Sequence, residues 1–117
     1  MDFDQAIAVH SEWKRKLSRY LQKPDGSLKS ADIALDNKCD LGKWIAIEGV
    51  KFSTLKEFNS LKAEHSRFHK AAAKIVVRAD HGEKVTEEMA LSSNSEFGNA
   101  STAVVQAIMH IKSAISH

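Results

Sequence analysis

The chain has 117 residues, of which 43% are apolar and 27% charged, so we expect one soluble globular domain over residues 1–117. The formal charge of +2 is close to neutral and the lysines are spread along the chain, which argues against nucleic-acid binding. No apolar run approaches the roughly 20 residues that cross a bilayer, and the acidic start lacks the order of a signal peptide. A single cysteine cannot form an internal disulfide, so we expect a cytoplasmic protein.

The first predicted helix covers about residues 2–22, with Asp2 or Asp4 as its cap. Its apolar residues recur at helical spacing: Phe3, Ile7, Leu17 and Leu21. The breaker around Pro24 ends this helix, and a loop follows with a short helical turn at 31–35.

A second, short helix is predicted from Asn37 to Ile47, and Gly49 ends it. Thr54 and Glu57 have the spacing of a capping box, which opens a third helix. The apolar stripe of this helix includes His65: Phe58, Leu61, His65, Phe68, Ala72, Ile75 and Ala79.

His81-Gly82 ends the third helix, and a fourth is predicted from 84–86 to about 115, with a kink or fraying at the polar stretch 92–95. Three long helices and one short helix, joined by short connections, predict an all-α antiparallel four-helix bundle.

Four residues that bind metals well fall on or beside the faces expected to turn inward. His10 is in step with the apolar stripe of the first helix. His65 and His69 are four residues apart, so their rings project from adjacent turns of one helix face. Cys39 supplies a thiol near the start of the short helix, where the helix dipole is expected to lower its pKa. Each residue alone is better explained by core packing, but a bundle can bring all four to one point. Imidazole with thiolate suits Zn²⁺ best.

This donor set also bears on catalysis. Three histidines and one cysteine fill a tetrahedral site, whereas catalytic zinc sites usually keep one position open. The residues between His65 and His69 include no glutamate, so the metalloprotease motif is absent. We therefore expect no enzyme activity, although a small metal-dependent hydrolase remains the alternative if a water replaces Cys39.

The same residues lie in three blocks with a characteristic order: His10-Ser-Glu-Trp13, Cys39-Asp-Leu-Gly42-Lys43-Trp44 and His65-Ser-Arg-Phe68-His69. Together these blocks, over roughly residues 7–75, resemble the chemoreceptor zinc-binding (CZB) domain family. The resemblance implies a four-helix bundle with a zinc site of three histidines and one cysteine, which would be His10, Cys39, His65 and His69.

The resemblance further implies a homodimer in the bacterial cytoplasm. Members of this family are usually attached to chemoreceptors or to diguanylate cyclases, which they regulate in chemotaxis or cyclic-di-GMP signalling. Some members are linked to sensing zinc, and others to sensing oxidants such as hypochlorous acid through the zinc-bound cysteine. This chain contains no receptor or cyclase region, so we expect either a stand-alone member or an excised domain.

A sensory role is consistent with the residues themselves. Cys39 comes from a shorter helix than the histidines, and its oxidation would weaken zinc binding and free that helix. Asp36 and Asp40 flank Cys39; either could accept a hydrogen bond from a ligating histidine, or Asp36 could simply cap the helix. The alternative to sensing is a purely structural zinc ion that stabilises a helical dimerisation module.

Overall fold

A computed structural model gives the fold and describes residues 2–35 and 39–115. The secondary structure over these residues is helical, with no β-strand among them, which confirms the all-α prediction. The molecule is elongated, with extents of 47 × 25 × 20 Å. No helix in the described part of the chain is both long enough and apolar enough to span a membrane.

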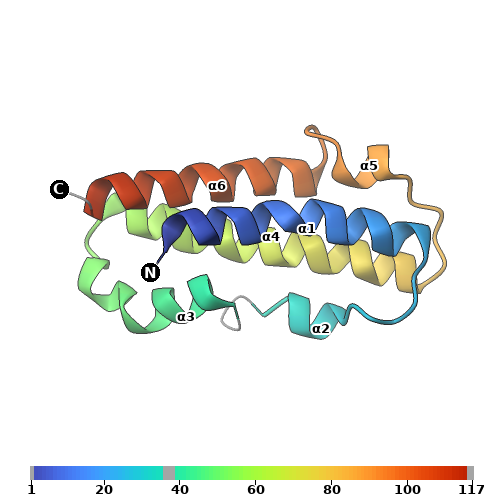
Figure 1. Ribbon diagram of the computed structural model, residues 1–117, viewed down its shortest axis with the longest axis horizontal. Coiled ribbons are helices and arrows are strands. Elements are labelled where there is room, and N and C mark those ends of the chain that lie inside the picture. Colours follow the sequence, from blue (N-terminus) through green and yellow to red (C-terminus); the bar gives the residue numbers. More distant parts are fainter. Residues whose placement is uncertain (1, 36–38, 116–117) are drawn as a thin grey trace.

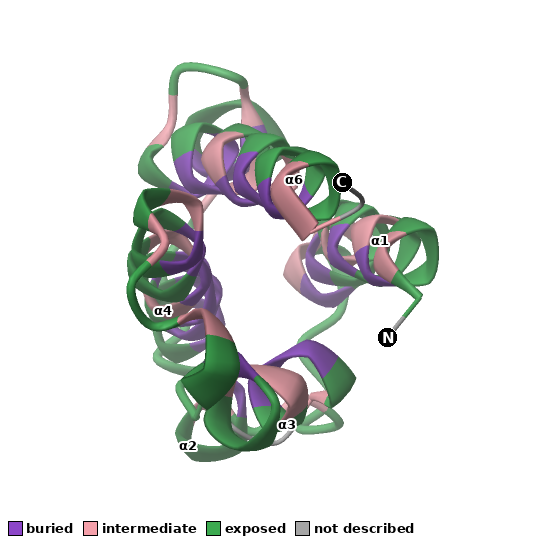
Figure 2. Cartoon of the chain, turned by 90° about the vertical axis from the view of Figure 1, so that its left-hand side faces the viewer, coloured by how far each residue is buried: buried purple, intermediate pink, exposed green. Residues whose placement is uncertain are grey.

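Three long helices lie side by side along the molecule: α1 (Phe3–Gln22), α4 (Lys56–Asp80) and α6 (Glu96–Ile115) (Figure 1). Each turns its buried stripe inward, as Figure 2 shows. The stripe predicted for α4 is buried along its whole length. The core therefore forms where the three stripes meet, and its largest fully buried apolar side chains are Leu17, Leu41, Leu61, Phe68, Val76, Phe97, Val104, Ile108 and Ile111.

Two short helices and one 3-10 turn occupy the remaining side: α2 (Ser30–Ile33), α3 (Asp40–Ile47) and η1 (Gly49–Phe52) (Figures 1 and 2). The helical turn predicted at 31–35 corresponds to α2. The predicted start of this helix, Asn37, lies outside the described residues. Cys39, which the prediction placed inside the helix, is not helical, and α3 begins at Asp40. Cys39 has extended backbone angles, and its sulfur accepts a bond from the Gly42 N–H, so Cys39 is the N-cap.

The capping box predicted at Thr54 is wrong. The N-cap of α4 is Leu55, which supplies no side-chain cap. The chain is still turning after η1 at Thr54, and α4 starts only after Leu55. The Asn59 side chain donates instead to the carbonyl groups of Ser53 and Leu55 across this start.

The predicted fourth helix is broken rather than kinked, into α5 (Glu87–Leu91) and α6. Thr86 caps α5 by accepting a hydrogen bond from the Met89 N–H at 3.1 Å. The Ser95 hydroxyl donates to the Ser92 carbonyl at 2.7 Å and accepts from the Gly98 N–H at 2.9 Å. These local bonds satisfy backbone groups that a continuous helix would have used, so the serine-rich stretch stops one helix and starts the next.

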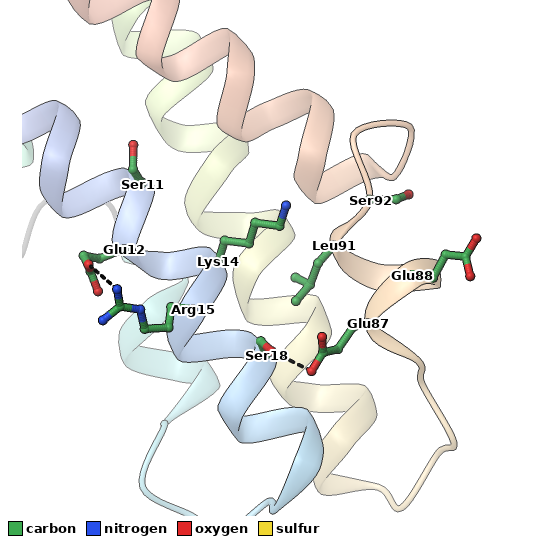
Figure 3. A pocket seen from close by; sticks show the side chains of 9 residues that line it. All are labelled: Ser11, Glu12, Lys14, Arg15, Ser18, Glu87, Glu88, Leu91 and Ser92. Carbon is green, nitrogen blue, oxygen red and sulfur yellow. Dashed lines mark hydrogen bonds and ion pairs between the residues drawn. The ribbon is translucent and has the colours of Figure 1, made fainter.

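The α5 helix is attached to the far end of α1. The Glu87 carboxylate accepts hydrogen bonds from Ser18 at 2.6 Å and from Gln22 at 2.8 Å. An open cavity of about 580 Å³ lies beside this contact, between α1 and α5, and most of the residues that line it are polar or charged (Figure 3). Figure 1 places α5 at the opposite end of the molecule from α3, and none of the described residues that line the cavity is a histidine or a cysteine.

Candidate metal centre

The fold brings the four predicted donor residues to one point. His10 comes from the middle of α1, Cys39 from the N-cap of α3, and His65 and His69 from successive turns of α4. One ligand atom from each residue can be chosen so that all four lie within 4.8 Å of one another. His10, His65 and His69 are 1%, 1% and 5% exposed, and Cys39 is half-buried. The cluster is therefore enclosed by three helices, with its most accessible side at the cysteine.

Backbone carbonyl groups fix the orientation of two of the rings. His10 Nδ1 lies 2.7 Å from the Ala6 carbonyl oxygen, and His69 Nδ1 lies 2.9 Å from the Ile33 carbonyl oxygen. A carbonyl oxygen only accepts, so each Nδ1 must carry the proton and donate it. In the neutral ring the opposite nitrogen, Nε2, then presents a lone pair. Both residues are thus held in the tautomer that binds a metal through Nε2.

The His10 Nε2 atom is buried and has no hydrogen-bond partner. Leaving a buried polar atom unpaired costs about 1–3 kcal/mol, so such atoms are uncommon and call for an explanation. The Nε2 lone pair of His10 lies among other metal-binding residues. A bound cation would satisfy this lone pair in place of a hydrogen-bond donor.

His10 and His65 are kept neutral by their surroundings. Burial, followed by the neighbouring rings of His69 and His10, lowers the pKa of His65 to about 3. Burial also lowers the pKa of His10, against the opposing effect of its hydrogen bond to Ala6. Neutral imidazole is the form that binds metal, so neither ring has to lose a proton before it binds one at neutral pH.

The distances agree with a tetrahedral zinc site. Zn–N bonds of about 2.05 Å and Zn–S bonds of about 2.3 Å require N···N separations of about 3.3 Å and N···S separations of about 3.6 Å. The Nε2 atoms of His65 and His69 are 3.0 Å apart. Cys39 Sγ lies 3.2 Å from His65 Nε2 and 3.7 Å from His69 Nε2. Cys39, His65 and His69 therefore fit a zinc ion with small adjustments, and a ring nitrogen of His10 lies within 4.8 Å of their ligand atoms, close enough to complete the donor set after a larger shift.

An aromatic cluster around Trp44 holds the cysteine's helix in place. The Trp44 ring meets Phe3 of α1 edge-on at 5.3 Å and stacks on Phe52 of η1 at 5.8 Å. It also contacts Phe58 of α4 at 6.3 Å. These contacts link α3 to both long helices that carry histidines, so Trp44 positions Cys39 from one turn away.

The carbonyl groups of Ala6 and Ile33 were missed by the sequence analysis. Every residue has a carbonyl, so no side-chain pattern marks the ones that orient a histidine. Asp36 or Asp40 was predicted to orient a histidine. Asp36 lies outside the described residues, and the N-cap of α3, the other role predicted for Asp36, is Cys39. Asp40 is exposed in the first turn of α3.

Comparison with known proteins agrees with this geometry. Neither the curated proteins nor the solved structures gave a match. The family model described as "Chemoreceptor zinc-binding domain" matches residues 10–76, which is more than half of the chain and includes all four donor residues. This is a regulatory family rather than a catalytic one. By this match, and by the clustering of its three histidines and one cysteine, the chain belongs to the chemoreceptor zinc-binding domain family.

Proposed function

We propose that this chain is a zinc-binding sensory or regulatory domain of bacterial signal transduction, with His10, Cys39, His65 and His69 as the four ligands of one Zn²⁺ ion. The observation that carries the proposal is the convergence of these four donors, together with the unpaired buried Nε2 of His10. Neutral imidazoles and a thiolate form a borderline-soft donor set, which favours zinc over magnesium or calcium.

The closed donor set favours regulation over catalysis. When bound, a zinc ion would supply a cross-link between α1, α3 and α4. Four protein ligands leave no coordination position for the water that a hydrolase needs. The same closed set also suits a purely structural zinc site that stabilises a helical dimerisation module, which is the second candidate function.

Cys39 is the point at which a signal would act. Of the four donors it is the one that α3 supplies, and it is also the most exposed. Hypochlorous acid removes two electrons from a thiolate, giving a sulfenic acid and chloride, and the sulfenic acid is a poorer ligand. Either this oxidation or a fall in available zinc would release α3 from the histidines of α1 and α4.

The architecture through which this signal would travel is an antiparallel four-helix bundle, with α2 and α3 together as its fourth member. We propose that this single domain, residues 1–117, forms a homodimer in the bacterial cytoplasm. Its output would be a chemoreceptor or a diguanylate cyclase, fused to it or bound as a partner, in chemotaxis or cyclic-di-GMP signalling. These proposals rest on the family to which the chain belongs.

Metal analysis tests the ligand set. The purified protein is expected to hold one zinc ion per chain. Cys39→Ala and His65→Ala are each expected to weaken zinc binding by at least about 100-fold, because a structural zinc site contributes about 10–16 kcal/mol through all of its ligands. His110→Ala is the matched control, since this histidine is exposed on α6. Full zinc occupancy in both site variants would rule out the four-ligand model.

A second experiment separates sensing from a structural role. A chelator or mild hypochlorous acid is expected to increase hydrogen exchange in residues 40–52 and to alter dimerisation. No change in either would leave zinc as a structural element only. A metal-bound water in place of Cys39 would instead revive the hydrolase.

A further inference from the structure

Two openings in the surface lead to the metal centre from different sides of α3. One, of about 140 Å³, lies between the start of α1 and the start of α3; it is lined by Asp2, Gln5, Ala6, Val9, His10, Cys39, Asp40 and Leu41. The other, of about 340 Å³, lies between α3 and α4; it is lined by Gly42, Ile45, Ala46, Val50, Ser53, Phe58, Lys62 and His65. A cation approaching the site therefore has two routes to compare.

The two openings differ in charge. Among the described residues that line the first opening, Asp2 and Asp40 are charged, and both are exposed. Among those that line the second, Lys62 is charged, and the other outer walls are mainly apolar. A hydrated divalent cation is attracted to the first opening and repelled from the second.

The inner end of the first opening also points to a cation. It is formed by His10 and Cys39, two of the four donor residues. The Nε2 atom of His10 is buried and unpaired, and one ring nitrogen of His10 lies within 4.8 Å of a ligand atom of each of the other three donors. Two exposed carboxylates and the residue that carries the unpaired nitrogen thus line the same opening.

We infer that the opening between α1 and α3 is the entry route for the metal ion, and that Asp2 and Asp40 concentrate the hydrated cation at its mouth. This inference rests on the proposed zinc function. The carboxylates hold the ion in its water shell, and the ion then exchanges waters for donor atoms at the inner end. Asp2 and Asp40 raise the rate at which the metal ion associates, and not the affinity of the site through direct bonds, because neither residue is among the four ligands.

The size of the effect follows from screened electrostatics. A carboxylate about one Debye length (about 8 Å) from a divalent ion enriches that ion about two-fold at physiological ionic strength. Two carboxylates together give about four-fold, and the association rate scales with this enrichment. At 1 M salt the Debye length shrinks to about 3 Å and the enrichment should disappear.

Stopped-flow absorbance with Co²⁺, which reports tetrahedral thiolate coordination by its colour, measures this rate on the metal-free chain. The test variant is Asp2→Asn/Asp40→Asn. Asparagine keeps the N-cap that Asp2 provides to the Gln5 N–H, so the start of α1 is preserved. Glu88→Gln removes one carboxylate on α5, at the other end of the molecule (Figures 1 and 3), and serves as the control for loss of a carboxylate away from the opening. Lys62→Gln probes the second opening.

We expect Co²⁺ association to slow about four-fold in the double variant at low to physiological salt and to match the wild type at 1 M salt. The final Co²⁺ spectrum should be unchanged, and Glu88→Gln should behave as the wild type. Equal rates in the double variant and the wild type, or a larger change in Lys62→Gln, would overturn the entry route. Failure of the wild type itself to give a thiolate–Co²⁺ spectrum would instead refute the proposed metal site.

Discussion

Replacing His10 by leucine should stabilise the metal-free protein while removing most of its stabilisation by zinc. His10 is 1% exposed, and its ring packs against those of Phe68 and His65, with centroid distances of 5.2 and 5.1 Å. Leucine has a similar volume and can pack against the Phe68 ring. If His10 served only to pack the core, its replacement would destabilise the metal-free protein. A gain in stability would therefore indicate that His10 is kept for metal binding.

The magnitude follows from the unpaired atom. A buried polar atom without a partner costs about 1–3 kcal/mol, and leucine removes the Nε2 atom of His10. The bond from Nδ1 to the Ala6 carbonyl is lost as well, but that carbonyl remains within the helical hydrogen-bond ladder of α1. We expect a net gain of about 1 kcal/mol in the free energy of unfolding, which raises Tm by about 4 °C for a chain of this size.

Zinc should reverse the order of stability. At a free zinc concentration 1,000 times Kd, the wild type gains about 4 kcal/mol, while His10→Leu lacks one of the four donors and gains far less. Thermal unfolding followed by circular dichroism, with chelator and with zinc, measures both effects. His110→Leu is the control and should follow the wild type with zinc. If metal-free His10→Leu unfolds at a lower temperature than the wild type, the argument from the unpaired nitrogen is refuted.

Three further predictions concern pH, the α5–α6 junction and the helix of the cysteine. In the metal-free protein the pKa of His65 falls from 6.5 to about 3 on folding, and that of His10 is also lowered. The unfolded chain therefore binds more protons below pH 6.5. As the pH is lowered from 6.5 to 4.5, the free energy of unfolding should fall by about 1.4 kcal/mol per pH unit through His65, and His10 should add to the fall in the same direction, as measured by urea titration from pH 7.5 to 4.5. Gly98→Ala places a methyl group against the Ser92 carbonyl and should cost about 1–3 kcal/mol, measured by urea unfolding. Trp44→Ala removes the aromatic anchor of α3 and should weaken zinc binding about 10-fold or more, measured against a competing chelator, with all four donors intact.

Each of these has a clear contrary result. Metal-free stability that stays constant between pH 6.5 and 4.5 would mean that the two histidines titrate normally in the folded state. A Gly98→Ala variant as stable as the wild type would mean that the 92–95 turn moves freely. Unchanged zinc affinity in Trp44→Ala would mean that the zinc ion alone positions α3.

Much of the helical framework follows from sequence periodicity. The stripe from Phe58 to Ala79 is buried as predicted, because side chains three and four residues apart share one face of a helix whatever surrounds it. The end of α4 was also predicted correctly, since Gly82 adopts a φ of 76° that other residues rarely take. These features depend on neighbours in the chain, which a sequence displays directly.

Helix starts were less predictable, because they depend on competing local bonds. Thr54 has the capping-box spacing, yet α4 begins after Leu55. The Ser92–Ser95 turn separates α5 from α6, where the sequence indicated only a weak point in one helix. In both places several polar groups could satisfy the same backbone atoms, and the tertiary packing chose among them.

The sequence by itself determined which four residues could bind a metal, because imidazole and thiol chemistry belongs to the side chains of His10, Cys39, His65 and His69. Only the tertiary structure decided that they meet, with one ligand atom from each lying within 4.8 Å of the others. It also decided how they are oriented, since the carbonyl groups of Ala6 and Ile33 direct the Nε2 atoms of two histidines inward. A carbonyl is common to every residue, so its role comes from position in space and not from the identity of the amino acid.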